Sequence, residues 1–266
     1  MSTVAILGAG VMGETLLAAI LRAGQDPSTV RISEKRAVRA DELRARYGVE
    51  VADAITAVRE ADVVLVVVKP QDVPSLLAEV GSEIAPTAVV VSLAAGVRTA
   101  TFEAVLPPGT AVVRAMPNTP AIVGAGMFGV SPGASCDDER LQQVVQLLRA
   151  GGEVVVVDES HQDALTAVSG SGPAYVFYLA EQMIAGGIEA GLDPDVARTL
   201  AVQTLVGSAR LLAESDDDAA ELRRRVTSPN GTTAAAIETF DAAGVDAGLR
   251  SGVLAAARRS AELSAD

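Results

Sequence analysis

The sequence contains a single cysteine, Cys136, and a single histidine, His161. One cysteine excludes an internal disulfide. One histidine gives little support for Ser-His-Asp catalysis or for a histidine-based metal site, so we expect no metal. Basic residues are also scarce, because 21 lysines and arginines stand against 34 acidic residues, for a net charge of −13. This deficit argues against a nucleic-acid partner, which needs a basic face, and against docking on anionic membranes.

Long apolar runs are missing as well. The longest, Val63–Val68, is far too short to cross a bilayer. The first residues lead directly into an apolar strand, without the basic segment that begins a signal peptide. The fractions of hydrophobic residues, 49%, and of charged residues, 21%, are those of a globular protein that can bury a core. We therefore expect a cytoplasmic protein.

Up to residue 157, short valine-rich runs alternate with helical patterns. The alternation predicts a parallel sheet buried on both faces, in a doubly wound α/β domain of the Rossmann type. The expected strands are Val4–Leu7, Val30–Ser33, Val63–Val68, Ala88–Val91, Ala111–Arg114 and Val154–Val157, and the expected helices are Met12–Ala23, Lys35–Tyr47, Pro74–Glu79 and Asp138–Ala150.

From residue 158 onward, strand-like runs disappear and helical periodicity takes over. Helices are expected over Pro173–Ala190, Pro194–Ala213, Thr233–Phe240 and Asp246–Leu263. The first two begin with proline, whose missing N–H costs nothing in a first turn. Asp216–Asp218 fits a solvated loop or a helix start. We therefore divide the chain into an α/β domain, residues 1–157, and an all-α domain, residues 158–266.

The turn after the first expected strand carries a glycine pattern typical of dinucleotide binding. Gly8 permits the tight turn, Gly10 lets the backbone approach a pyrophosphate, and Gly13 lets the helix pack close to the strand. The helix N-terminus offers free N–H groups to the phosphates. A glycine-rich turn without a ligand is the alternative, but the flanking strand and helix favour a nicotinamide dinucleotide.

Three residues after the second expected strand bear on the type of dinucleotide. Glu34 can accept hydrogen bonds from a ribose 2′-hydroxyl, which favours NAD. Lys35 and Arg36 can hold a 2′-phosphate, which favours NADP. Both cations also suit a solvated helix start, so the sequence leaves the choice open.

Three further segments follow strands that end at the same edge of the predicted sheet: Lys69–Gln71, Ser92–Gly96 and Met116–Pro120. Ligands of open α/β sheets bind beyond the carboxyl ends of the strands. Asn118 and Thr119 can hydrogen-bond a ribose or the nicotinamide amide. Each segment alone is equally compatible with ordinary turn chemistry. Their convergence on one edge favours a shared cofactor cleft.

Two segments of the helical part stand out. Ser169–Tyr178 combines a Ser/Gly stretch with three of the few aromatics, and a core patch on a helix is the alternative for the rings. Val226–Thr233 contains a Pro-Asn-Gly turn that leads into a helix, where exposed N–H groups can bind a small carboxylate. From the spacing alone, an N-capping threonine without a ligand is the favoured interpretation there.

The few candidate bases also restrict the chemistry. Oxidation of an alcohol usually needs a strong general base, whereas a protonated C=N bond is already electrophilic. Reduction of an imine mainly requires that a hydride donor be positioned and the nitrogen hydrogen-bonded.

Together these segments resemble the pyrroline-5-carboxylate reductase family. The resemblance covers nearly the whole chain and rests on Gly8–Gly13, Val68–Gln71, Ser92–Gly96, Met116–Pro120, Ser169–Tyr175 and Thr227–Thr233. It implies reduction of 1-pyrroline-5-carboxylate to L-proline with NADPH, or with NADH, at the last step of proline synthesis. It also implies homodimers formed through the C-terminal helices and, as in many members, further assembly into decamers.

The resemblance implies a role for each matching residue. Thr233 would hydrogen-bond the ring nitrogen and assist its protonation. The substrate would contact Ser171, Gly172, Ser228, Gly231, Thr232 and Thr233, with the amides of Gly231–Thr233 on its carboxylate. The cofactor would contact Gly8, Gly10, Val11, Met12, Gly13, Glu34, Lys35, Arg36, Val68, Lys69, Pro70, Ala94, Ala95, Gly96 and Asn118.

One residue departs from the family pattern. Asn230 stands where the family usually has the first of two glycines. Asparagine tolerates positive φ better than most residues, so we expect the loop to keep its shape.

Two other functions remain as alternatives. A related imine or β-hydroxyacid reductase would share the scaffold, but a hydroxyacid enzyme is expected to carry a lysine on the Pro173–Ala190 helix, and the only lysines are Lys35 and Lys69. A dinucleotide-sensing regulator would need Gly8–Gly13 but not the Thr227–Thr233 loop.

Overall fold

The computed structural model describes residues 2–265, and the side chains of residues 2–264. The chain forms two compact units. One contains the residues up to Ser171 together with those from Ala256 onward, and the other is Gly172–Ala255.

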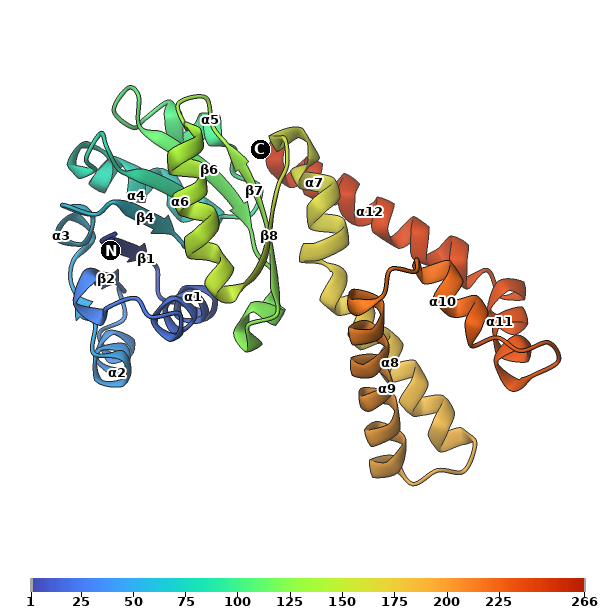
Figure 1. The fold of residues 1–266 in the computed structure, drawn as a ribbon. Coiled ribbons are helices and arrows are strands. Elements are labelled where there is room, and N and C mark those ends of the chain that lie inside the picture. Colours follow the sequence, from blue (N-terminus) through green and yellow to red (C-terminus); the bar gives the residue numbers. More distant parts are fainter. Residues whose placement is uncertain (1, 266) are drawn as a thin grey trace. The chain divides into compact units, whose positions relative to one another are not determined.

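The first unit alternates strands and helices, as the valine-rich runs predicted (Figure 1). Its strands are β1 (Val4–Leu7), β2 (Val30–Ser33), β3 (Glu50–Val51), β4 (Val63–Val66), β5 (Val89–Ser92), β6 (Ala111–Met116), β7 (Gly126–Pro132) and β8 (Gly152–Val156). Its helices are α1 (Val11–Arg22), α2 (Ala37–Tyr47), α3 (Ala54–Val58), α4 (Val73–Val80), α5 (Thr99–Glu103), α6 (Asp138–Leu148) and α7 (Gln162–Leu165).

The strands form one sheet in the order β3-β2-β1-β4-β5-β6-β7-β8. Strands β1–β6 are parallel, but β7 pairs antiparallel with β6, so β7 and β8 run in the opposite direction. The expectation of an entirely parallel sheet was therefore wrong at this end. The reason is that only Pro117–Ala125 connects β6 to β7, and a parallel pair needs a longer crossover.

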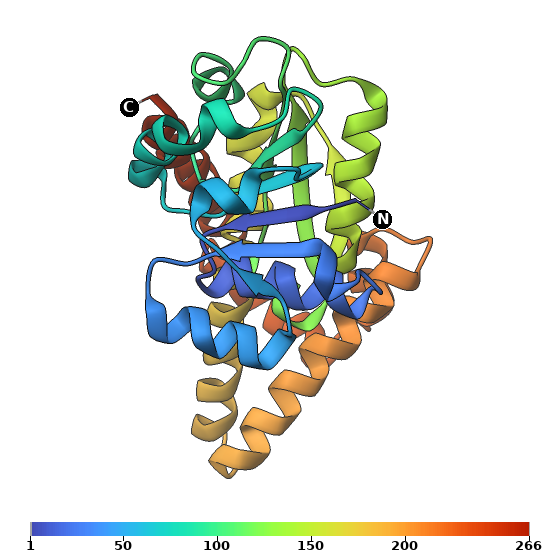
Figure 2. The same ribbon diagram turned by 90° about the vertical axis from the view of Figure 1, so that its left-hand side faces the viewer.

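Side chains of the sheet alternate between two buried faces. Leu16 and Leu17 of α1 and Leu43 of α2 pack with α6 on one face, against strand residues such as Ile6 and Leu65. The other face, which includes Leu7 and Val66, is covered by apolar residues of α3, α4 and α5. Helices thus lie on both faces of the sheet (Figure 2), and the doubly wound architecture is confirmed.

Strands β3 and β7 and the short helices α3 and α5 were missed in the sequence. Strand β3 has only two residues, which is too few to show a period. Strand β7 contains two glycines and ends in proline, which weakens any strand signal. Helices α3 and α5 have five residues each, too few for one amphipathic repeat.

The sheet ends at Val156, next to the expected domain boundary after residue 157, but the compact unit extends further to Ser171. Tertiary contacts explain the extension. The buried Gln162 donates from Nε2 to the backbone oxygen of Gly129 at 3.2 Å and to Oγ of Ser131 at 2.8 Å. Ser260, near the C-terminus, donates to Asp163 at 2.6 Å, which joins the last turns of the chain to this unit.

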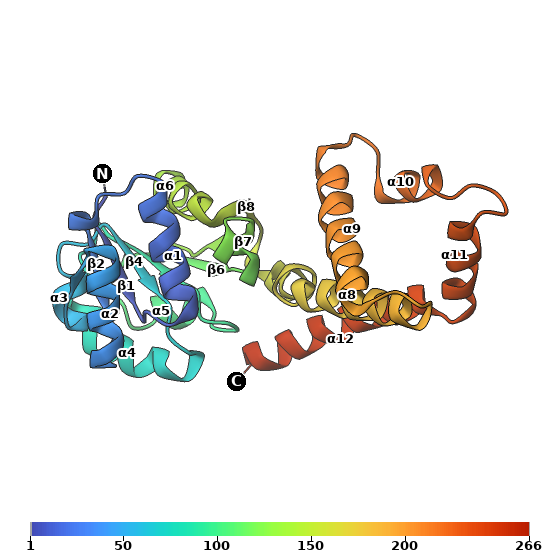
Figure 3. The ribbon, with the colours of Figure 1, turned by 90° about the horizontal axis from the view of Figure 1, so that it is seen from below.

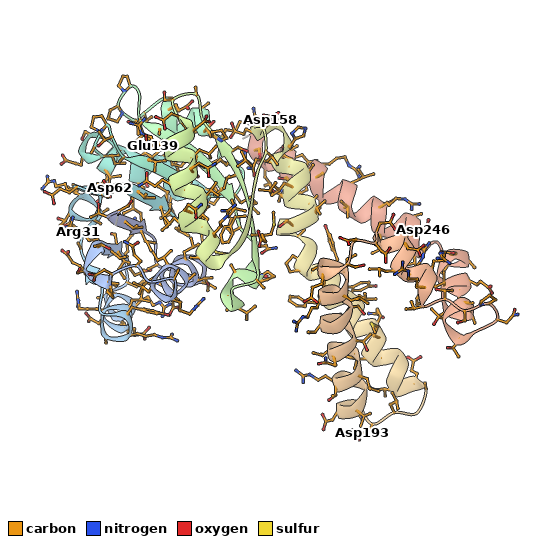
Figure 4. All side chains as sticks on the ribbon, in the orientation of Figure 1. Arg31, Asp62, Glu139, Asp158, Asp193 and Asp246 are labelled. Carbon is orange, nitrogen blue, oxygen red and sulfur yellow. The ribbon has the colours of Figure 1, made fainter. Side chains whose placement is uncertain are left out.

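The second unit is all helical. It contains α8 (Gly172–Glu189), α9 (Pro194–Glu214), α10 (Ala219–Arg225), α11 (Thr232–Ala242) and the start of α12 (Val245–Ala265). Helices α8 and α9 pack against each other, and in the view of Figure 3 they run at an angle to each other. Asp193, at the turn between them (Figure 4), caps α9 by accepting from the N–H of Asp195 at 3.0 Å. Asp218 caps α10 in the same way, as the acidic run allowed.

Large apolar side chains of the second unit are exposed in the single chain. Phe177 and Tyr178 of α8 are 61% and 63% exposed, and Val206 of α9 is 58% exposed. Among its described residues, only the small Ala197 and Ala201 are buried hydrophobic residues. Helices with an apolar face normally bury it, so these faces need a partner. Across residues 2–265, no helix combines the length and the apolar character that a membrane span requires.

Candidate functional site

The glycine turn between β1 and α1 is shaped by steric restriction at two of its three glycines. Gly8 has φ +95°, and a Cβ there would lie 2.8 Å from the backbone oxygen of Val67. A Cβ on Gly13 would lie 2.1 Å from the oxygen of Gly8, so only glycine lets the helix start so close to the turn. A Cβ on Gly10 would meet no atom of another segment within 4 Å, so this backbone faces open space.

The N-terminus of α1 faces the same open space. Gly10 is the N-cap residue, and no side chain caps the helix there. The first amides of a helix carry partial positive charge and need acceptors. Val11 is 74% exposed, so its surroundings are accessible to a ligand. This arrangement suits a pyrophosphate bound at Gly10–Met12.

Glu34 lies directly after β2, and its carboxylate is hydrogen-bonded and ion-paired with Arg36. The backbone N–H and the Nε of Arg36 each donate to Oε1 of Glu34 at 3.0 Å. The side chain of Glu34 is only 8% exposed, whereas that of Arg36 is 67% exposed. Burial opposes ionisation of Glu34, but the hydrogen bonds and the charge of Arg36 outweigh it and lower the pKa of this carboxyl. The carboxylate is therefore charged, and Arg36 presents its guanidinium to solvent.

A cavity of about 730 Å³ opens at the carboxyl ends of β1, β2 and β4. Strand β1 lies between the other two, and the chain crosses to the opposite side of β1 after β3. This is the switch point at which open α/β sheets bind ligands. Predicted cofactor residues in its wall are Gly8, Glu34, Lys35, Arg36, Val68 and Lys69.

The next predicted cofactor residues follow β4 and β5. Pro70 begins a short 3-10 turn, Pro70–Asp72, that leads into α4. Ala94 is buried, Ala95 is exposed, and Gly96 has φ +77°. Pro70, Ala95 and Gly96 line a second cavity of about 820 Å³. The structure thus gathers these residues in one cavity wall, apart from Ala94.

Asn118, after β6, has its side chain engaged within the protein. Its Nδ2 donates to the backbone oxygen of Ser169 at 3.3 Å and to Oγ of Ser169 at 3.2 Å. Its Oδ1 accepts from the N–H of Met127 at 2.8 Å. The amide expected to contact the cofactor therefore already has partners at both ends. No sequence pattern indicates this contact, because Ser169 is 51 positions away.

Ser171 and Gly172, two predicted substrate residues, lie where a short π-helix, Thr166–Gly170, meets α8. The N–H of Ser171 donates to the oxygen of Thr166 at 2.8 Å, which closes the wider π turn. Such turns are rare and are often found at functional sites. Ser171 belongs to the first compact unit and Gly172 to the second.

The loop before α11 holds the other predicted substrate residues, all in the second unit. Asn230 has φ +57°, which is in the left-handed region. Asparagine thus adopts the positive φ that it was expected to tolerate in place of the family's usual glycine. The N–H of Gly231 donates to the oxygen of Ser228 at 3.0 Å, which closes the turn. Gly231 is the N-cap of α11 and no side chain caps this helix, so the N-capping threonine that the spacing alone favoured was wrong.

The start of α11 therefore offers uncapped amides at Thr232 and Thr233, the first two residues of an 11-residue helix. A small carboxylate is the ligand such amides suit. Within the described residues, no protein group hydrogen-bonds to the hydroxyl of the half-buried Thr233. This hydroxyl is available to a substrate atom.

A partly buried ion pair between β6 and the 3-10 turn Glu159–His161 was missed in the sequence. The side chain of Arg114 on β6 is 6% exposed, and its Nη1 lies 3.4 Å from Oε1 of Glu159. Glu159 also accepts from the N–H and Oγ1 of Thr99, at 2.9 and 2.8 Å. Thr99 is the first residue of α5, so Glu159 holds the helix that ends the Ala94–Arg98 loop. Only tertiary structure joins these three residues.

His161 and Cys136, the single histidine and the single cysteine, are not among the residues that line the two cavities or form the loop before α11. His161 is exposed at the end of the 3-10 turn Glu159–His161. Cys136 is half-buried, and burial together with nearby carboxylates raises the pKa of its thiol to about 11, which leaves it unreactive. In the part of the chain that the structure describes, no three His, Cys, Asp or Glu side chains form a group that could hold a metal ion.

Two family models match the sequence. Residues 159–263 match the model described as pyrroline-5-carboxylate reductase dimerisation, and residues 3–96 match the model described as NADP oxidoreductase coenzyme F420-dependent. The first match covers the helical part, and the second covers the segment that contains β1 to β5.

Individual proteins match over the whole chain. A pyrroline-5-carboxylate reductase from Corynebacterium melassecola is 40% identical over 99% of this chain and 99% of its own length. The solved structure of a pyrroline-5-carboxylate reductase from Coxiella burnetii has a TM-score of 0.92 and 32% identity, covering 99% of this chain and 98% of its own. Plasmodium falciparum pyrroline carboxylate reductase, solved with NADP bound, has a TM-score of 0.88 over 99% and 98% of the chains; at 23% identity it shows the fold alone.

Proposed function

This chain belongs to the pyrroline-5-carboxylate reductase family, and from that membership we propose that it reduces the C=N bond of 1-pyrroline-5-carboxylate to give L-proline. The observation that carries the proposal is the match of 40% identity along 99% of both chains. The reaction consumes one NADPH and one proton and yields NADP⁺ and proline. Proline synthesis is the process this reaction completes.

We propose for the chain's own residues the roles that the family resemblance implies, and the geometry supports them. The amides of Gly10–Met12 bind the pyrophosphate of the dinucleotide, which supplies the hydride when bound. The amides of Gly231, Thr232 and Thr233 hold the substrate carboxylate at the uncapped start of α11. The hydroxyl of Thr233 hydrogen-bonds the ring nitrogen and assists its protonation. Ser171, Gly172 and Ser228 complete the substrate contacts.

NADPH is the proposed cofactor. The match of residues 3–96 to an NADP oxidoreductase model supports it. So does the pairing of Glu34 with Arg36, because it neutralises the carboxylate that would repel a 2′-phosphate. The exposed guanidinium of Arg36, with Lys35 and Lys69 in the same cavity wall, supplies positive charge for that phosphate. NADH is a second, weaker donor in this proposal.

The chain is proposed to work as a homodimer, which in turn assembles into a decamer. The dimerisation model matches residues 159–263, and the same helices expose apolar faces in the single chain. We retain residues 1–157 as the proposed dinucleotide-binding domain and 158–266 as the proposed substrate-binding and dimerisation domain. The cytoplasmic location stays a prediction.

Purified protein given 1-pyrroline-5-carboxylate and NADPH tests the proposal directly. We expect loss of NADPH absorbance together with an equal amount of proline, measured independently. A sensor would bind NADPH without turnover, so a binding titration run in parallel separates it from an enzyme. Absence of turnover with both NADPH and NADH in oligomeric protein would refute the proposal.

A further inference from the structure

We infer that Asn118 is a positioning residue, whose side chain fixes the turn that carries Ser169–Ser171 to the loop that follows β6. The inference rests on the proposed function, because Ser171 is one of the proposed substrate residues. It replaces the expectation that the Asn118 side chain contacts the cofactor. Three observations support the inference. Both ends of the Asn118 amide are hydrogen-bonded, its partner Ser169 lies in a π turn, and Gly170 of the same turn packs on Met116.

The amide of Asn118 has only one orientation that fits its partners. The backbone oxygen of Ser169 can only accept, and the backbone N–H of Met127 can only donate. Nδ2 must therefore face Ser169, and Oδ1 must face Met127, as the structure has them. The same amide thus joins the start of β7 to the turn before α8.

The turn that Asn118 holds is irregular. Thr166–Gly170 is a π-helix, in which the wider ring admits one extra residue relative to an α-turn. Its backbone is closed by the N–H of Ser171 on the oxygen of Thr166. Turns of this kind are rare within helices, so a hydrogen bond from outside the turn helps to maintain it.

A second contact reinforces the first. A Cβ on Gly170 would lie 2.8 Å from Cε of Met116, so the backbone of Gly170 already packs on that methionine. Two consecutive turn residues, Ser169 and Gly170, thus meet Asn118 of the segment after β6 and Met116, the last residue of β6. The two segments are held together in one geometry.

The hydrogen bonds between Asn118 and Ser169, which we call the link, connect a segment near the proposed dinucleotide site to a proposed substrate residue. The segment that contains Asn118 follows a strand at the carboxyl edge where the dinucleotide is proposed to bind. Ser171 comes directly after the turn, so the geometry of the turn sets where Ser171 lies. Small misplacement of a substrate-contacting group costs up to about a hundredfold in rate. A cofactor ligand would instead affect NADPH affinity.

Asn118→Asp tests the link with little change of shape. The aspartate keeps an acceptor for the N–H of Met127 but cannot donate to Ser169. Asn118→Ala shows whether any effect comes from the new charge. Ser169→Ala is the matched control, because it removes only the Oγ acceptor and leaves the backbone oxygen in place. Three quantities are measured: the NADPH Kd without substrate, kcat and KM for the imine at saturating NADPH, and hydrogen exchange of residues 166–171.

For both Asn118 variants we expect an NADPH Kd within about twofold of wild type and a kcat/KM for the imine lowered about tenfold or more. Exchange at the Ser171 amide should become faster while the sheet stays protected. Ser169→Ala should show a much smaller change in each quantity.

Other outcomes would overturn the inference. A raised NADPH Kd with unchanged kcat/KM for the imine at saturating NADPH would make Asn118 a direct cofactor ligand. Wild-type kinetics and exchange in both variants would show that the link has no role. Failure of the proposed function looks different, since wild-type protein would then show no turnover; unchanged exchange in the variants would still refute the link.

Discussion

Arg36 donates to the carboxylate of Glu34 from both its backbone N–H and its Nε, each at 3.0 Å. The sequence presented these residues as competitors, one favouring NAD and the other NADP. The structure makes them a pair, in which the buried carboxylate orients an exposed guanidinium. The acidic residue therefore supports the cation instead of competing with it.

Arg36→Ala should weaken the use of NADPH more than that of NADH. A charge-assisted hydrogen bond contributes about 1.5–3 kcal/mol, so KM for NADPH should rise roughly ten- to a hundredfold, with a smaller change for NADH. Steady-state kinetics with both cofactors measure the two effects. Arg44→Ala is the control, because Arg44 is an exposed arginine of α2, the helix that begins directly after Arg36, and is paired with Asp41. An equal loss with both cofactors would exclude a 2′-phosphate contact.

Thr233→Ala should lower kcat about ten- to a thousandfold, because a hydrogen bond to the ring nitrogen acts in the transition state. Thr233→Ser keeps the hydroxyl and should recover most of the rate. Thr232→Ser changes the neighbouring position conservatively and serves as the control. If Thr233→Ala turned over at the wild-type rate, Thr233 would have no part in protonation.

Asn230→Gly should be tolerated, whereas Asn230→Ala should not. A residue with a Cβ costs about 1–2 kcal/mol in the left-handed region, and asparagine is among the few that adopt it readily. With φ at +57°, alanine should lower the free energy of unfolding by about 1 kcal/mol and raise KM for the imine. Denaturant unfolding and kinetics check both. Equal stability of the alanine and glycine variants would show that the loop adopts another conformation.

The stability of the first unit should fall at acid pH through Glu14 of α1. This carboxylate accepts from Arg39, from Arg46 at 3.0 Å and from the hydroxyl of Tyr47 at 2.9 Å, which ties α1 to α2. Burial opposes its ionisation, but the hydrogen bonds from Arg39 and Tyr47 and the two arginine charges outweigh it and lower the pKa of Glu14 below 4.5.

Because the pKa is lower in the folded protein, the unfolded chain takes up the proton first as pH falls. The stabilisation is therefore complete above about pH 4.5 and is lost as pH drops through the folded-state pKa. Glu14→Gln should lower the melting temperature at pH 7, and its difference from wild type should shrink below pH 4.5. Glu153→Gln, at an exposed position of β8, is the control. A difference that stayed constant down to pH 3 would contradict this assignment.

Elements whose signal is local could be predicted from the amino-acid sequence alone. Valine runs such as Val63–Val66 have the length and composition of buried strands. Glycine is required at Gly8 and Gly13, because a Cβ at either position would clash with backbone atoms. The Pro-Asn-Gly turn before α11 is local in the same sense, since the preference of Asn230 for positive φ needs no distant partner.

Contacts between distant residues became visible only in the folded chain. Asn118 and Ser169 are 51 positions apart, and Thr99 and Glu159 are 60 apart, so no spacing rule connects either pair. The reversal of β7 and β8 also has no local signal, because strand direction depends on how the connection closes and not on side-chain period. Local propensity sets which residues form an element, whereas burial and hydrogen bonding between elements set how the functional side chains are oriented.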